Sequence, residues 1–84
     1  MKIELFYTPG CEKCATARDD LKVAAEEIIP GIIWRELNAL DELDYAVELG
    51  VVTLPAIAID GEVVFSSLPT SRQLRRELTK RKRN

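Results

Sequence analysis

Eight residues near the N-terminus mark the change from a predicted strand to a predicted helix: Tyr7-Thr8-Pro9-Gly10-Cys11-Glu12-Lys13-Cys14. Residues 2–7, which lead into this stretch and end at Tyr7, place Ile3, Leu5 and Tyr7 in alternation with their neighbours, which predicts a mostly buried strand. Pro9 lacks a backbone N–H and Gly10 tolerates a tight turn, so the strand ends there. A helix is predicted over residues 11–29, because apolar side chains recur at spacings of three or four and share one face: Cys14, Ala17, Leu21, Ala24, Ala25 and Ile28. Arg18 is expected to lie away from that face.

The remaining pattern alternates strands and helices. A second strand over residues 32–37 follows the long helix, so it is expected to run parallel to the first. A short helix capped by Asp41 is predicted over residues 42–49, with apolar side chains available for burial: Leu43, Ala46, Val47 and Leu49. Strands over 56–59 and 62–66 are joined by an Asp60-Gly61 hairpin. A last helix begins at a capping box formed by Thr70 and Gln73. The order β-α-β-α-β-β-α predicts an α/β fold in which helices flank a four-stranded mixed sheet.

Composition is typical of one small globular domain spanning residues 1–84. The chain is 46% hydrophobic and 31% charged, and no apolar run approaches the roughly 20 residues that span a bilayer. The first six residues contain an acid and show no cleavage site of an export signal, so we expect a cytoplasmic location. Histidine is absent from the sequence, which excludes His-based acid–base catalysis and a mixed Cys/His zinc site within one chain.

Charge is unevenly spread along the chain. Residues 1–69 carry 5 basic and 13 acidic side chains, whereas residues 70–84 carry 7 basic and 1 acidic. The basic end could bind a nucleic acid or a membrane, or its cations could complement the dipole of the last helix. We favour the second interpretation and expect neither nucleic acid nor membrane as a partner, because the acidic remainder repels phosphates.

Cys11 and Cys14 are the candidate reactive residues. A thiolate attacks a disulfide, and the first turn of a helix lowers a thiol pKa through its free N–H groups and its dipole. Lys13 adds a nearby cation that could tune Cys11 or could merely be solvated. Because Cys14 follows one helical turn later, the two sulfurs can form a disulfide. Cys11 is therefore expected to attack a substrate disulfide, and Cys14 to resolve the mixed disulfide.

The residues 7–14, with Thr53-Leu54-Pro55 and the Asp60-Gly61 hairpin, resemble the thioredoxin fold family, and most of all its small glutaredoxin-sized members. The resemblance covers nearly the whole chain. It implies a thiol–disulfide oxidoreductase with no cofactor beyond its redox-active disulfide, whose partners are protein disulfides. It also implies that Pro55 is cis and packs against the cysteine pair, and that Leu54 offers backbone groups to an extended substrate. Thr53 either touches that substrate or simply favours a strand.

Departures from the family pattern concern the source of electrons. Larger thioredoxins carry a buried acid six residues before the first cysteine, where this chain has Leu5. Glutaredoxins bind glutathione through a Lys before the cysteines and a glycine-rich turn after the last strand, where this chain has Thr8 and residues 66–70. We therefore expect a flavin- or ferredoxin-linked protein reductase as the electron donor, and no use of glutathione. We also expect a monomer.

Other readings of the cysteine pair remain open. Two thiolates between a first strand and a first helix can carry Cu(I) in small copper chaperones, but those domains end on a strand whereas this chain ends on a predicted helix. A zinc site would need two more ligands, and nothing in the sequence signals them, so we expect no metal. A redox-inactive adaptor is a third alternative.

Tyr7 could shield the cysteines or belong to the core, and Trp34 is expected to pack against a helix.

Overall fold

The computed structural model has the predicted element order, β-α-β-α-β-β-α. The structure describes residues 1–8 and 12–82, and for residues 12–16 it describes the backbone alone. The strands are β1 Lys2–Tyr7, β2 Ile33–Asn38, β3 Ala56–Ile59 and β4 Glu62–Phe65, and the helices are α1 Glu12–Ile28, α2 Leu43–Leu49 and α3 Ser71–Lys82. The α/β fold class is confirmed, and the ends of the elements lie within about two residues of the predicted ones.

The four strands form one mixed sheet in the order β2-β1-β3-β4. β1 runs parallel to β2, as the long intervening helix predicted, and antiparallel to β3. β3 and β4 form the predicted hairpin, in which Asp60 and Gly61 both have positive φ values, 51° and 83°. Those values match the turn type that Asp-Gly pairs favour.

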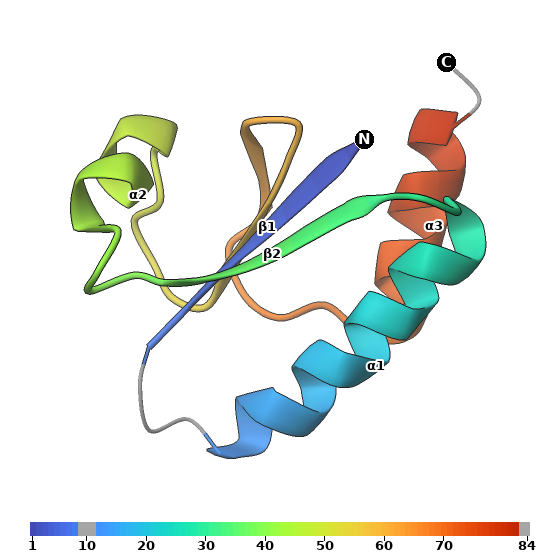
Figure 1. Cartoon of the computed structure of the whole chain (residues 1–84), viewed down its shortest axis with the longest axis horizontal. Helices are drawn as coiled ribbons and strands as arrows, with labels where there is room; N and C mark the ends of the chain where they lie inside the picture. The colour runs from blue at the N-terminus through green and yellow to red at the C-terminus, as the bar shows by residue number, and fades with distance from the viewer. Residues whose placement is uncertain (9–11, 83–84) are drawn as a thin grey trace.

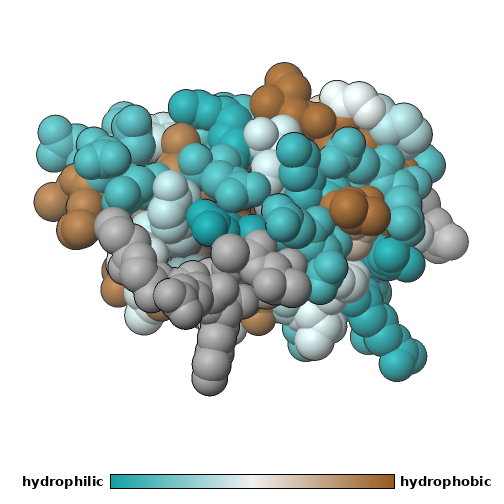
Figure 2. Space-filling model, turned by 60° about the horizontal axis from the view of Figure 1, so that its bottom comes forward, coloured by the Kyte–Doolittle hydropathy of each residue, from teal (hydrophilic) through white to brown (hydrophobic). Residues whose placement is uncertain are grey.

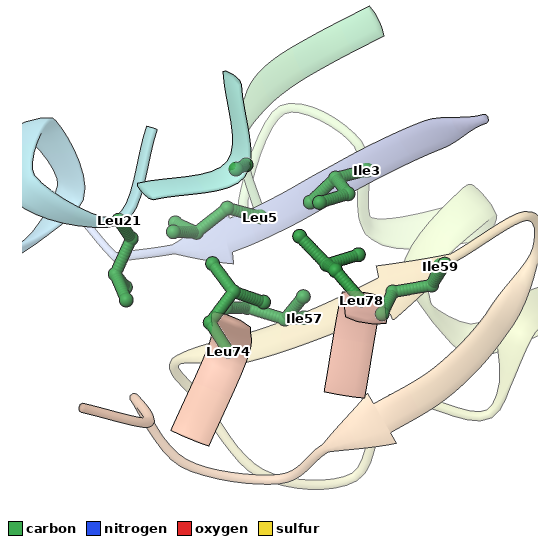
Figure 3. Close-up of a cluster of buried hydrophobic side chains, with 8 residues drawn as sticks. Ile3, Leu5, Leu21, Ile57, Ile59, Leu74 and Leu78 are labelled. Atoms are coloured by element: carbon green, nitrogen blue, oxygen red, sulfur yellow. The ribbon is translucent and has the colours of Figure 1, made fainter. Parts of the chain in front are cut away.

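Helices α1 and α3 lie next to each other and cover one face of the sheet (Figure 1). Figure 3 shows Leu74 and Leu78 of α3 pointing toward the strand residues Ile3, Leu5, Ile57 and Ile59. All six side chains are fully buried, and Leu21 of α1 closes the same cluster. This cluster is the larger core, and it holds α1 in place above β1.

Residues Thr70 and Gln73 start α3 with the predicted capping box. The Thr70 N–H donates to Gln73 Oε1 at 2.9 Å, and the Gln73 N–H donates to Thr70 Oγ1 at 3.1 Å. Two backbone donors that the helix leaves free are thereby satisfied. Among the described helices, none is both long and apolar enough to cross a membrane.

A smaller core on the opposite face of the sheet contains Phe6, Leu37, Ala46 and Ala58. Helix α2 supplies only Ala46 to it as a fully packed residue, whereas Leu43 and Val47 are 56% and 66% exposed. The expectation that these two side chains are available for burial is therefore wrong. A helix of two turns contacts the sheet through one narrow side, so its other apolar side chains remain in solvent.

The ends of α2 differ in how well the sequence predicted them. Glu42, and not Asp41, occupies the N-cap position, and it makes no side-chain capping bond. Gly50 ends the helix as predicted, in the left-handed conformation with φ 91°, and its N–H donates to the Val47 carbonyl at 3.0 Å. The chain then runs through residues 51–55 into β3.

Candidate functional site

One edge of the sheet brings the predicted site segments together. Tyr7 ends β1, and α1 begins nearby at Glu12. Because Phe6 pairs with Ala56, the start of β3 and the preceding Pro55 lie at the same edge. Figure 1 shows the start of α1, the end of β1 and the turn before β3 at this side of the sheet. The arrangement places Cys14, the third residue of α1, in the first turn of a helix that starts at this edge.

The predictions for the cysteine pair and for Lys13 extend beyond what the structure describes. Cys11 lies outside the described residues, and for Lys13 and Cys14 the described part is the backbone of α1. The separation of the two sulfurs, the pKa of Cys11 and the effect of Lys13 therefore stay predictions.

The segment before β3 is held by both backbone and side-chain features. The Leu54–Pro55 peptide bond is cis, which is the isomer that the family resemblance implies. Thr53 Oγ1 donates to the Ser66 carbonyl at 2.8 Å, which joins this segment to the residue after β4. Leu54 is 40% exposed, so part of this residue lies where another chain can reach it. The described contact of Thr53 is thus a structural one, and its contact with substrate stays a prediction.

The ring of Tyr7 contacts the side chain of Arg18, which the sequence pattern had predicted to lie elsewhere. The guanidinium of Arg18 lies 4.3 Å from the centre of the Tyr7 ring, and Arg18 Nη1 lies 3.4 Å from Glu36 Oε1. The Arg18 side chain is only 18% exposed, and its buried Nε has no hydrogen-bond partner among the described residues. The expectation that Arg18 lies away from the inner face is wrong, because a long side chain can bend back under the helix to reach an aromatic ring and a carboxylate.

The position of Arg18 connects it to the cysteine pair. Residues four apart on a helix are neighbours, and Arg18 follows Cys14 by four. Long helical side chains also lean toward the N-terminal end of their helix, which here is the end that carries Cys14. The sequence does contain a sign of this contact: Arg18 follows Cys14 by four residues, and an aromatic residue, Tyr7, ends the preceding strand.

We predict that Arg18→Gln shifts the pH at which the reduced dithiol becomes reactive to a higher value, because a nearby cation favours the thiolate. The measurement is the rate of alkylation by iodoacetamide as a function of pH. Arg18→Lys keeps the charge and should retain most of the effect, while the exposed Lys22→Gln should change nothing. An Arg18→Gln profile that overlays the parent profile would contradict the prediction.

Glu4 is a fully buried carboxylate on the α2 side of the sheet. The Tyr45 hydroxyl of α2 donates to its Oε1 at 2.7 Å, Arg35 Nη1 lies 3.3 Å from its Oε2, and Lys2 Nζ lies 3.6 Å from Oε1. The Tyr45 ring also contacts Phe6, with centroids 5.9 Å apart. Because Ala46 is the one buried residue of α2, the bond from Tyr45 to Glu4 is a main attachment of this helix. The sequence pattern alone assigned no role to Glu4. Its position between the core residues Ile3 and Leu5 was the one sign that this acid is buried and paired.

This bond gives the stability of the protein a pH dependence. The hydrogen bond that Tyr45 donates to Glu4, with partial desolvation second, raises the pKa of Tyr45 above its usual 10.0. A raised tyrosine pKa stabilises the fold fully below the unfolded-state value, and this contribution is lost as pH rises past 10. Tyr45→Phe should therefore lose less stability than the parent across that alkaline range, as measured by urea unfolding at several pH values. Parallel curves for the two proteins would show that the bond has no such effect.

Comparisons with known proteins agree with this geometry. Residues 1–79 match the family model described as a thioredoxin domain. The chain is 32% identical over 81 residues to a thioredoxin of Methanocaldococcus jannaschii, an alignment that covers 96% of this chain and 95% of the relative. It is 31% identical over 74 residues to a probable thioredoxin of Methanothermobacter thermautotrophicus, covering 88% and 87% of the two chains.

A solved structure shows the same fold at low sequence similarity. It is described as a malarial protein, and it matches with a TM-score of 0.70 at 15% identity over 95% of this chain and 93% of the other. At that identity the likeness concerns the fold alone.

Proposed function

This chain belongs to the thioredoxin family, and we propose that it reduces protein disulfides through the pair Cys11 and Cys14. The family supports a thiol–disulfide oxidoreductase role in general, and it does not favour a Cu(I) carrier. The observation that carries the proposal is the position of Cys14, in the first turn of α1 at the edge where cis-Pro55 precedes β3.

The proposed reaction proceeds in two exchanges. The Cys11 thiolate attacks one sulfur of the substrate disulfide, forming a mixed disulfide and releasing the other substrate sulfur as a thiolate. The Cys14 thiolate then attacks the Cys11 sulfur, which forms the Cys11–Cys14 disulfide and releases the second substrate thiolate. Two electrons pass from the pair to the substrate, and the released thiolates take up protons from solvent.

Features of the described residues support each part of this scheme. The start of α1, in whose first turn Cys14 lies, has free N–H groups and the positive end of the helix dipole, which favour a thiolate. Arg18 adds a second positive charge one turn after Cys14, held by Tyr7 and Glu36. Leu54, exposed beside Pro55, offers backbone groups that can pair with an extended substrate segment.

We further propose that a flavin- or ferredoxin-linked protein reductase returns the pair to the dithiol, since the sequence lacks the residues by which glutaredoxins bind glutathione. In this proposal the protein is a cytoplasmic electron carrier whose reduced form is the Cys11–Cys14 dithiol. It acts as a monomer and needs no further cofactor. Lys13 is proposed to assist the ionisation of Cys11.

Trapping with Cys14→Ser tests the function. Without the second thiol, the mixed disulfide on Cys11 cannot be resolved, so covalent complexes with substrate proteins should accumulate. The variant is incubated with cell lysate, and the complexes are separated on gels without reductant and identified by mass spectrometry. Cys11→Ser serves as the control and should trap no partners. Equal trapping by both variants would show that Cys11 is not the attacking residue.

A further inference from the structure

The outer side of α2, together with Leu40 three residues before its start, presents apolar side chains to solvent. Leu40, Leu43 and Val47 are 67%, 56% and 66% exposed, and they follow one another at spacings of three and four. We call these three residues the α2 face. Exposed apolar side chains that gather in one place mark interaction surfaces in soluble proteins.

The α2 face borders a hollow in the surface. Its volume is about 470 Å³, and it is lined by Leu40, Asp41, Glu42, Leu43, Asp44, Tyr45 and Glu48. Four of these residues are acids, and two are leucines of the α2 face. The lining is mainly polar, with four carboxylates beside two leucines, and such a lining suits the charged end of a lysine or arginine side chain with part of its aliphatic stem.

Acids predominate along the part of the chain that forms this surface, although Glu36 and Glu62 within it are paired with Arg18 and Arg81. Residues 36–71 contain seven acidic side chains and no lysine or arginine. This stretch includes β3, β4 and the segment that carries Leu54 and Pro55, as well as α2. The acids of this stretch repel an anionic partner and attract a cationic one.

The opposite charge lies at the far side of the molecule. Figure 1 shows α2 near one end of the long axis and α3 toward the other. Arg75 of α3 pairs with Glu27 at 2.9 Å and Arg81 with Glu77 at 3.0 Å, while Arg72, Arg76 and Lys80 form an exposed row at spacings of four. This polarity turns the α2 end toward an approaching cationic protein.

The α2 face is continuous with the proposed site. β1 and β2 are parallel, so the end of β2, which leads to α2, lies at the same edge as Tyr7 and Pro55. Residues 50–54 connect the end of α2 directly to Pro55, and Val52 among them is 89% exposed. In Figure 2, hydrophobic atoms reach the surface at the left end of the molecule, where hydrophilic residues adjoin them.

We propose that the α2 face and its hollow select the substrate: a protein whose disulfide is flanked by lysine or arginine side chains, one of which enters the hollow. The stem of that side chain packs on Leu40 and Leu43, and its charged end lies among Asp41, Asp44 and Glu48. This inference rests on the proposed disulfide reduction and names the substrate class for it.

The test uses two short peptides with the same apolar core and one intramolecular disulfide, flanked by lysines in one peptide and by glutamates in the other. The reduced protein is mixed with each, and the second-order rate of disulfide reduction is measured. At low ionic strength we expect the lysine peptide to react about tenfold faster, with the ratio falling toward one as salt is added.

Matched charge variants locate the effect. The double variant Asp44→Asn with Glu48→Gln should lower the ratio of the rate with the lysine peptide to the rate with the glutamate peptide. The control variant Asp20→Asn with Glu26→Gln makes the same charge change at exposed positions of α1 and should preserve most of that ratio. Leu43→Gln should weaken the binding of the lysine peptide, so the second-order rate should fall while the rate at saturating peptide is retained.

The outcomes separate this inference from the function it rests on. Equal rates for the two peptides, without salt dependence, would overturn the substrate preference and leave disulfide reduction intact. Failure to reduce either peptide would overturn the proposed function itself. If sedimentation shows dimers that Asp44→Asn with Glu48→Gln dissociates, a second copy occupies the α2 face and the substrate assignment is wrong.

Discussion

Cys11→Ser is expected to abolish the reduction of protein disulfides, with a rate loss of more than about a thousandfold. A serine hydroxyl does not ionise near neutral pH and cannot form the mixed disulfide on which the exchange depends. Cys14 alone is not expected to compensate, because its proposed role begins only after that intermediate exists. The measurement is a single-turnover assay in which the reduced protein is mixed with excess insulin, and the thiols formed on the insulin chains are counted after these chains are separated from the protein.

The Cys14→Ser variant is the informative control for this result. It should react once with insulin, release one thiol equivalent and then stop as a mixed disulfide. Circular dichroism shows whether both variants keep their secondary structure. Insulin reduction by Cys11→Ser at the parent rate would refute the assignment of the attacking residue.

Leu74→Ala is expected to lower the free energy of unfolding by about 2–5 kcal/mol. Leu74 is fully buried between α3 and the sheet, in the cluster with Leu5 and Ile57 (Figure 3). Truncation removes apolar contacts and leaves a cavity that the surrounding strands cannot fill. For a chain of 84 residues, whose total stability is of the order of 4–13 kcal/mol, this loss is a large fraction.

Urea unfolding followed by circular dichroism measures the loss. Arg76→Ala on the same helix is the matched control, because Arg76 is exposed and the change should stay within about 0.5 kcal/mol. A Leu74→Ala loss no larger than that of the control would show that α3 does not depend on this contact.

Local patterns in the sequence predicted most of the backbone. The Asp60-Gly61 hairpin, the Gly50 helix end and the Thr70–Gln73 capping box are confirmed, since each depends on residues within a few positions of one another. The order of elements is confirmed as well, and so is the parallel pairing of β1 with β2, which the long intervening helix predicted. The cysteine spacing in the same way pointed to a family that the comparisons support.

Three features depended on contacts between distant segments. Tyr45 meets Glu4 across 41 positions, which turned an acid in β1 into the anchor of α2. Arg18 meets Tyr7 and Glu36 from two different strands, so its helical position alone gave the wrong face. Leu43 and Val47 are exposed because a short helix contacts the sheet along one narrow side.

The sequence by itself determined the order and approximate ends of the strands and helices, where the chain turns, and that Cys14 lies in the first turn of a helix, because neighbouring residues control backbone conformation. Which charged and apolar side chains are buried or left in solvent was decided only by the tertiary structure, because burial depends on which surfaces the packed elements cover. The acidic hollow beside α2 is therefore visible only in the folded protein.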